Sequence, residues 1–172
     1  ESGPAANYAT SYTYVGLTGG APSNPGCGTI WCTTTSLPNG AGIIFAAATT
    51  YGGRVYFSGG NNNSTAQNTV YYAALSPTTG AIGTWTKSLS SLQSTVNEHF
   101  TAEANGFLYV VGDGSCGTSA VQYAPLLPGG ALGPCSSTQA IARNAAAVAF
   151  SNASIYYMGG QPFASPVTTV SR

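Results

Sequence analysis

The chain has 172 residues and a mass of 17.3 kDa, enough for one ordinary domain or a small pair. Four acidic residues, four basic residues and one histidine give a charged fraction of 5% and a net charge of zero. Binding to nucleic acid or to anionic membrane surfaces needs clustered Lys and Arg, so the composition excludes both. Acid–base and metal chemistry are not excluded, but few residues could support them.

Uncharged residues supply the polar surface and the turns. The chain has 23 Gly, 10 Pro and 11 Tyr and is rich in Ser and Thr, which favour strands and turns. We therefore expect an all-β extracellular protein with many turns. Acceptor triplets for N-glycosylation begin at Asn62, Asn63 and Asn152, although such triplets also arise by chance in Ser/Thr-rich chains.

An internal repeat organises the chain. Segments 53–60, 106–113 and 153–160 share a short apolar strand that ends in Gly-Gly or Gly-Asp, and their central tyrosines, Tyr56, Tyr109 and Tyr156, are 53 and 47 residues apart. Repeats of this length indicate one supersecondary unit per period.

The repeat divides the chain into consecutive units of short strands. In chain order we expect a half unit over 10–36, whole units over 41–89 and 97–139, and a partial unit over 143–171. In each whole unit a small, apolar first strand turns into the second, as at Asn105-Gly106, a strong hairpin signal. A variable loop then leads to the third and fourth strands.

Four strands in about 50 residues is the spacing of a propeller blade, and the chain resembles the kelch-like β-propellers. The resemblance rests on Gly59-Gly60 closing strand two, on the Tyr of strand three, and on Gly83-Thr84-Trp85 in strand four, with a variant at 28–31. Gly112-Asp113 and Cys135 depart from the pattern. The resemblance implies antiparallel four-stranded blades and a family of binding and scaffolding proteins with a few enzymes.

The predicted units amount to about three blades, whereas a closed propeller has about four to eight. Three explanations stay open: a fragment of a longer propeller, which we favour; two copies that close one ring; or packing against other subunits in a filament. The expected partners are therefore the remainder of a longer propeller or a second copy, with glycans as a further partner. No nucleic acid partner and no membrane insertion are expected.

The cysteines lie at 27, 32, 116 and 135, without the spacing of a zinc or redox motif. We expect two disulfides. The unit map favours the local pairs Cys27–Cys32 and Cys116–Cys135, each within one unit.

Glu98, His99, Glu103 and Asp113 gather scarce titratable groups near the start of the third unit. Strand periodicity places His99 and Glu103 on one face, where they could bind a metal or form an acid–base pair. The alternative is that these residues are polar blade-edge and turn residues. No cofactor, resident metal or catalytic residue is assigned.

The loops after the second strands are the candidate ligand loops, with Asn61, Asn62, Asn63 and Phe163 as their candidate residues. We expect a non-enzymatic structural, adhesive or assembly module, located outside the cell or on its surface. The alternative is a glycan-binding or glycan-modifying propeller whose site lies on these loops.

Overall fold

The protein is all-β, and no helix occurs among the residues that its computed structural model describes. Those residues are 12–14, 16–18, 21–23, 32–37, 42–63, 65–112, 120–139, 146–151, 154–160 and 170–171. Every strand pairing in them is antiparallel.

Sheet I has four strands in the order β10-β9-β6-β5. Its strands are β5 (Ala47–Tyr51), β6 (Arg54–Ser58), β9 (Val70–Ala74) and β10 (Thr86–Lys87). The turn between β5 and β6 is Gly52-Gly53, and both residues have positive φ, 56° and 71°. That conformation is the one a tight two-residue hairpin needs, and glycine adopts it at little cost.

Sheet II repeats this arrangement in the order β11-β12-β13-β14. Its strands are β11 (Phe100–Ala104), β12 (Phe107–Val111), β13 (Ala120–Pro125) and β14 (Ser136–Gln139). The predicted hairpin at Asn105-Gly106 is confirmed, with φ of 54° and 77°. The two sheets lie within the predicted units 41–89 and 97–139.

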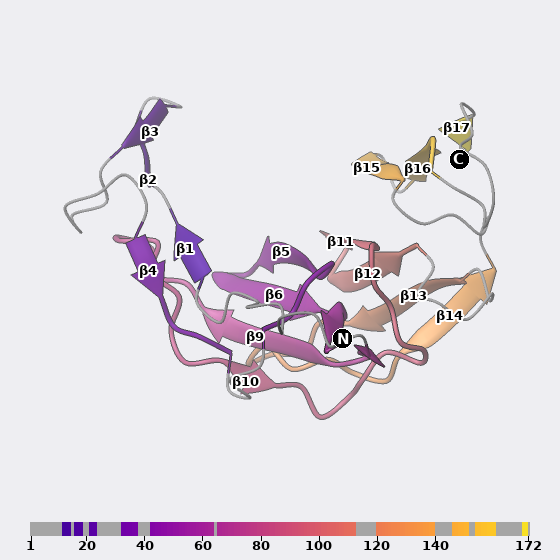
Figure 1. Cartoon of the computed structure of the whole chain (residues 1–172), viewed down its shortest axis with the longest axis horizontal. Coiled ribbons are helices and arrows are strands. Elements are labelled where there is room, and N and C mark those ends of the chain that lie inside the picture. The colour runs from indigo at the N-terminus through magenta and orange to yellow at the C-terminus, as the bar shows by residue number, and fades with distance from the viewer. Residues whose placement is uncertain are drawn as a thin grey trace, which may run out of the picture.

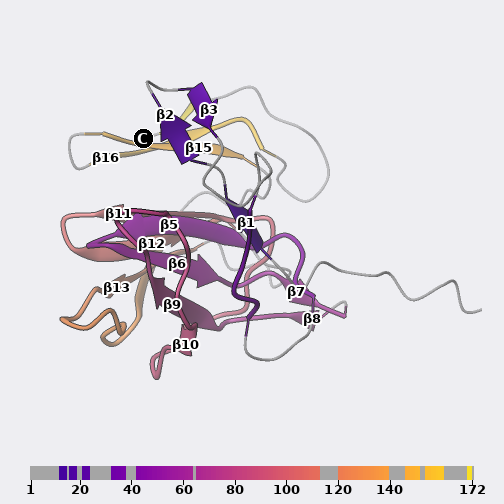
Figure 2. The ribbon, with the colours of Figure 1, turned by 90° about the vertical axis from the view of Figure 1, so that its left-hand side faces the viewer.

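Sheet III has three strands in the order β15-β16-β17. Its strands are β15 (Ala147–Ser151), β16 (Ser154–Met158) and β17 (Val170–Ser171). The remaining strands form three pairs: β1 (Tyr12–Tyr14) with β4 (Cys32–Thr34), β2 (Gly16–Thr18) with β3 (Ala21–Ser23), and β7 (Asn61–Asn62) with β8 (Thr65–Ala66). Figure 2 shows β7 and β8 projecting beyond one end of sheet I.

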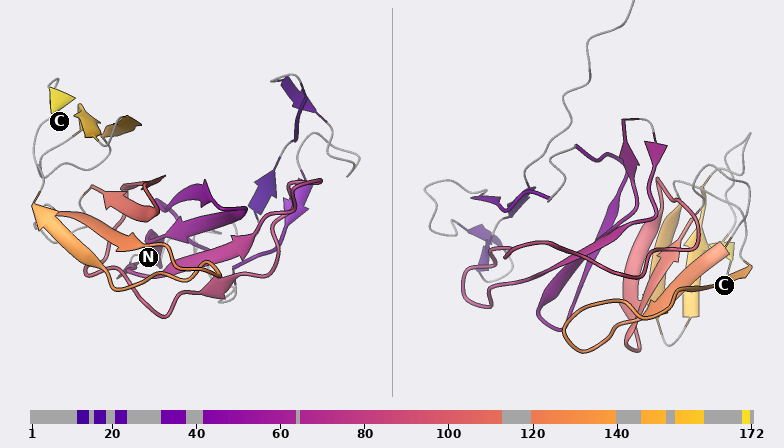
Figure 3. Two further views of the ribbon diagram at one scale, coloured as in Figure 1. Left: turned by 180° about the vertical axis from the view of Figure 1, so that it is seen from behind. Right: turned by 90° about the horizontal axis from the view of Figure 1, so that it is seen from below.

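Successive sheets follow one another along an open arc (Figure 1, and Figure 3 from behind and below). The first strands of the sheets are neighbours, because β5 contacts β11 and β11 contacts β15. The arc does not close on itself. The sheets therefore stack face to face through their side chains rather than joining into one continuous sheet.

The core is divided among the spaces between sheets. Tyr56 and Val70 of sheet I pack against Leu108 and Val110 of sheet II. The opposite face of sheet I contributes its own cluster, which Leu37 covers. A third cluster joins sheet II to sheet III. The cluster on the opposite face of sheet I consists of Leu37, Val55, Phe57, Tyr71, Ala73 and Trp85. The cluster between sheets II and III consists of Val111 and Val121, with Tyr109, Ala146, Val148, Phe150 and Ile155 packed against them. Sheet I is thus covered on both faces, which explains the four consecutive buried residues at the end of β6.

The glycine pair that ends the second strand has a packing reason. A Cβ on Gly59 would lie 2.5 Å from Val96 Cγ2 and 2.8 Å from His99 Cε1, both in the segment that enters sheet II. A Cβ on Gly60 would lie 2.5 Å from Ile43 Cγ2, in the segment that enters sheet I. Both glycines also have positive φ. The chain can therefore pass between the two entry segments only where it has no side chain.

Candidate functional site

The structure separates the predicted polar cluster. His99 precedes β11 and Glu103 lies near its far end, so four residues of extended chain, about 13 Å, keep them apart. Glu98 is exposed and has a φ of 52°. Asp113 lies outside the described residues. Within those residues, no three His, Cys, Asp or Glu side chains lie close enough together to hold a metal ion.

His99 is instead part of a buried polar contact between sheets I and II. Its side chain is 8% exposed, and its Nε2 is 3.0 Å from Oγ of Ser58, the last residue of β6. The same Ser58 oxygen lies 2.7 Å from Oγ1 of Thr101 in β11. Nδ1 of His99 is buried, and it has no hydrogen-bond partner among the residues that the structure describes.

Burial lowers the pKa of His99 to about 4, and the contact with Ser58 opposes this only in part. A charged imidazolium would lose its hydration there and would place a second N–H on Nδ1, where no acceptor lies. His99 is therefore neutral at physiological pH and serves as a structural group in the interface.

Glu103 has a local structural contact at the hairpin of sheet II. Its Oε1 accepts a hydrogen bond of 2.9 Å from the backbone N–H of Gly106. Its other carboxylate oxygen has no hydrogen-bond partner among the described residues. Glu103 therefore fixes the turn and still has one acceptor to offer.

The candidate ligand loop of sheet I forms the short β7–β8 hairpin. Asn61 and Asn62 are half-buried, and Asn63 is exposed with a φ of 46°. Asn61 joins its backbone to Ile44 by hydrogen bonds in both directions, 2.7 and 3.0 Å long. Phe163 of the other candidate loop and the acceptor Asn152 lie outside the described residues.

The cysteine prediction needs a correction. Cys135 is a free, half-buried thiol, so the predicted Cys116–Cys135 disulfide is not formed. Its Sγ lies 3.6 Å from the carbonyl oxygen of Ser136, and burial raises the pKa of the thiol. Cys32 is disulfide-bonded. Its predicted partner, Cys27, lies outside the described residues, so that pairing stays a prediction.

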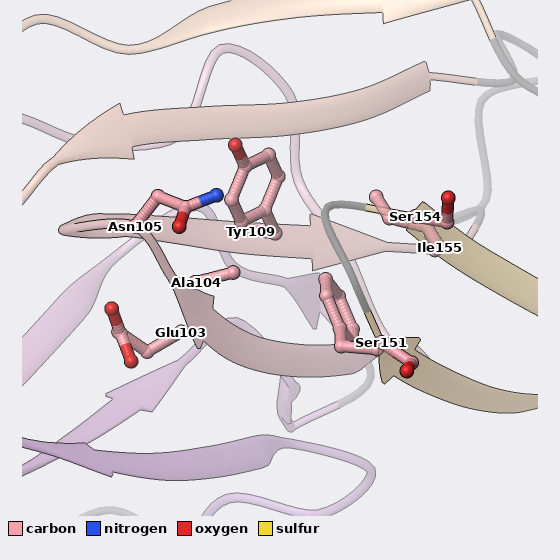
Figure 4. Close-up of a pocket in the computed structure, with 8 residues that line it drawn as sticks. Glu103, Ala104, Asn105, Tyr109, Ser151, Ser154 and Ile155 are labelled. Atoms are coloured by element: carbon pink, nitrogen blue, oxygen red, sulfur yellow. The ribbon is translucent and has the colours of Figure 1, made fainter.

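A cavity of about 380 Å³ opens between sheets II and III, at the ends where their first hairpins turn. Figure 4 shows the Asn105 amide directed toward Tyr109, with Ser154 and Ile155 on the opposite side. Phe150 completes the wall, and its ring centroid is 5.9 Å from that of Tyr109. The lining residues are Glu103, Ala104, Asn105, Tyr109, Phe150, Ser151, Ser154 and Ile155.

The cavity combines aromatic walls with uncommitted polar groups. The side chains of Asn105, Ser151 and Ser154 make no hydrogen bond to other described residues. None of the lining residues is Lys, Arg or His. Sequence reasoning missed this cavity because its residues come from two repeat units, although it had singled out Glu103, Asn105 and Tyr109 for other reasons.

Comparison with known proteins bears on the fold. No family model matches the chain, and no curated protein matches it. Among solved structures, 87 chains match. One of them, described as "Structure of YjhT", aligns with a TM-score of 0.62 and 17% identity over 81% of this chain.

The same alignment covers 45% of the YjhT chain, so this protein spans less than half of that length. At 17% identity the likeness extends to the fold alone. No helix of the described part is long and apolar enough to span a membrane. The comparisons thus place the chain with an all-β fold of stacked antiparallel sheets.

Proposed function

We propose that the chain contributes about three blades of a kelch-like propeller and acts as a non-enzymatic structural, adhesive or assembly module outside the cell. The observation that carries the proposal is the stacking of sheets I, II and III, with their first strands side by side and an apolar cluster in each space between them. Wedge-shaped, four-stranded units that meet along their first strands are typical of propeller blades.

The position of the glycine pair supports the kelch-like form of the blade. Gly59 and Gly60 stand where the second strand passes between the entries to its own sheet and to the next. Gly159 and Gly160, which follow β16 of sheet III, also have positive φ, 68° and 86°. The motif on which the resemblance rests is therefore tied to contacts between neighbouring blades.

The open arc supports an assembly role. Sheets at the ends of an arc have one face without a neighbouring sheet, and burying such a face provides the driving force for association. Further blades can come from a longer polypeptide or from a second copy of this chain. The role of the single histidine as a buried interface residue supports a non-enzymatic module.

Light scattering on the purified 172-residue chain, with denaturing mass spectrometry of the native polypeptide, tests the proposal. A particle of about twice 17.3 kDa supports two copies that complete one ring. A native polypeptide longer than 172 residues supports blades supplied by the same chain. A native polypeptide of 17.3 kDa that stays monomeric at all concentrations overturns the proposal, because nothing would then complete the arc.

A further inference from the structure

We propose that the cavity between sheets II and III binds one ring of a neutral saccharide. Its volume of about 380 Å³ lies within the range of small-molecule sites, roughly 300–1,000 Å³. This site differs from the candidate ligand loops. The cavity lies at the end of the sheets where the first hairpins turn, whereas the β7 loop follows β6 at the opposite end of sheet I. The proposal does not rest on how the arc is completed, since both walls belong to one chain.

Comparison of the repeat units shows that the cavity departs from the arrangement in the preceding interface, between sheets I and II. The hairpin pairings align Ala104 of sheet II with Tyr51 of sheet I, and Tyr109 with Tyr56. In the preceding interface Tyr56 is 2% exposed, and a Cβ on Gly106 would lie 4.0 Å from the Tyr51 hydroxyl. Tyr51 therefore reaches toward the hairpin of the next sheet. Alanine at position 104 cannot do so, and the equivalent space stays open.

The turn residue that follows Ala104 also differs from its equivalent in sheet I. Asn105 stands where Gly52 stands in sheet I, and both have positive φ, 54° and 56°. Asn-Gly and Gly-Gly are both favoured in tight two-residue hairpins, so this turn accepts either asparagine or glycine. What asparagine adds is a side-chain amide, which is exposed and which Figure 4 shows directed toward Tyr109.

The lining favours a ring with one apolar face and several hydroxyls. Tyr109 and Phe150 offer aromatic surface against which the C–H face of a pyranose can lie, and Ile155 extends that surface. Asn105 both donates and accepts, Ser151 and Ser154 do so through hydroxyls, and one oxygen of Glu103 accepts. A neutral polyol can pair with all of these groups.

The charge of the residues that line the cavity restricts the class of ligand that it can bind. Among the described residues that line the cavity, Glu103 is the only charged one. An anionic sugar would meet this carboxylate with no cation to offset it, so acidic saccharides are disfavoured. A small cation such as choline would be attracted to Glu103 and Tyr109, but would leave the hydroxyl and amide groups unpaired. The neutral saccharide satisfies more of the site.

Saturation-transfer NMR with the intact protein tests the proposal. The probes are glucose, galactose, mannose, N-acetylglucosamine and N-acetylgalactosamine, with N-acetylneuraminic acid and choline as charged comparisons. We expect transfer to the ring protons of at least one neutral sugar. Transfer to none of the five, or only to a charged comparison, overturns the proposal.

Two variants that copy the preceding interface locate the binding. Ala104→Tyr places in the cavity the larger side chain that Tyr51 provides at the equivalent position of sheet I, and Asn105→Gly removes the amide but keeps a residue that suits the turn. Each should weaken binding at least about tenfold, the usual cost of losing a central contact. Leu89→Ala changes a fully exposed residue outside the cavity and should bind like the unchanged protein.

Binding that survives both cavity variants overturns the assignment to this site. Melting curves establish that each variant is folded. Should Ala104→Tyr fail to fold, Asn105→Gly still decides the matter, because glycine is already the residue at this turn in sheet I.

Discussion

Protonation of His99 should destabilise the protein between pH 7 and pH 5. The pKa of this histidine falls from 6.5 to about 4 on folding, so the unfolded chain takes up a proton at a higher pH than the folded chain. Its neutral form is compatible with the contact to Ser58, and the stability that depends on it is complete above pH 6.5. That stability is lost as the pH falls toward 4.

The size of the effect follows from the two pKa values. With 6.5 in the unfolded chain and about 4 in the folded chain, lowering the pH from 7 to 5 should cost about 2 kcal/mol. The total below pH 4 is about 3 kcal/mol by the same relation. For a domain of this size, 2 kcal/mol corresponds to a drop in Tm of about 4–8 °C.

Urea unfolding followed by tryptophan fluorescence, at pH 7 and at pH 5, measures the effect. Histidine is the side chain that ordinarily titrates in this window, and the chain has one. His99→Gln keeps an amide near the position of Nε2 and cannot be protonated, so its unfolding free energy should be almost independent of pH. Glu98→Gln, the control at the neighbouring exposed residue, should keep the full dependence.

Two results would refute this reasoning. One is a wild-type protein that is equally stable at both pH values, which would mean that the imidazole is hydrated in the folded chain. The other is a pH dependence that persists in His99→Gln, which would assign the effect to another group.

Two further predictions follow from the glycine contacts and the cysteines. Gly59→Ala should destabilise the protein by about 2–4 kcal/mol, because the new Cβ combines a φ of 56° with a 2.5 Å approach to Val96. Gly52 has the same φ, but a Cβ there would meet open space. Urea unfolding should therefore show a loss of only about 1–2 kcal/mol for Gly52→Ala. Thiol titration in denaturant should find two free thiols per chain, because Cys32 is disulfide-bonded and Cys135 is free, which leaves two of the four cysteines unpaired. Finding no free thiol would show that Cys135 is paired, and equal losses in the two glycine variants would remove the role of the Val96 contact.

The sequence predicts the local elements well, because turn chemistry and strand patterns are read from neighbouring residues. The hairpins at Gly52-Gly53 and Asn105-Gly106 form as expected. Trp85 of the Gly83-Thr84-Trp85 pattern is 5% exposed, and its Nε1 donates to the carbonyl oxygen of Thr35. The all-β class follows from the same patterns.

The candidate site could not be predicted in this way. Strand periodicity predicts that His99 and Glu103 share one face, but the group that fixes His99 is Ser58, 41 residues earlier in the chain and in another sheet. Cys135 was assigned a partner from the unit map alone, which does not include the direction of its side chain. Both outcomes depend on contacts between sheets, and a repeat pattern does not specify those contacts.

The two interfaces of sheet II show how a repeat acquires a site. Toward sheet I, polar groups join sheet II to sheet I and to the segment between the two sheets: Ser58 meets His99, and Gln122 of β13 accepts from Ser94 N–H at 3.0 Å and donates to its Oγ at 2.9 Å. Toward sheet III, no side-chain hydrogen bond joins the two sheets within the described residues. Aromatic rings and the cavity occupy that space instead.

The difference has a physical consequence for a chain with so little charge. Neutral hydrogen bonds and close packing occupy most of the first interface, and Nδ1 of His99, which has no partner among the described residues, is buried there. In the second interface the small side chain of Ala104 leaves both volume and unpaired polar groups. Unpaired polar groups in a partly enclosed space are costly unless water or a ligand satisfies them. The proposed saccharide site therefore depends on the positions at which one sheet differs from its neighbour.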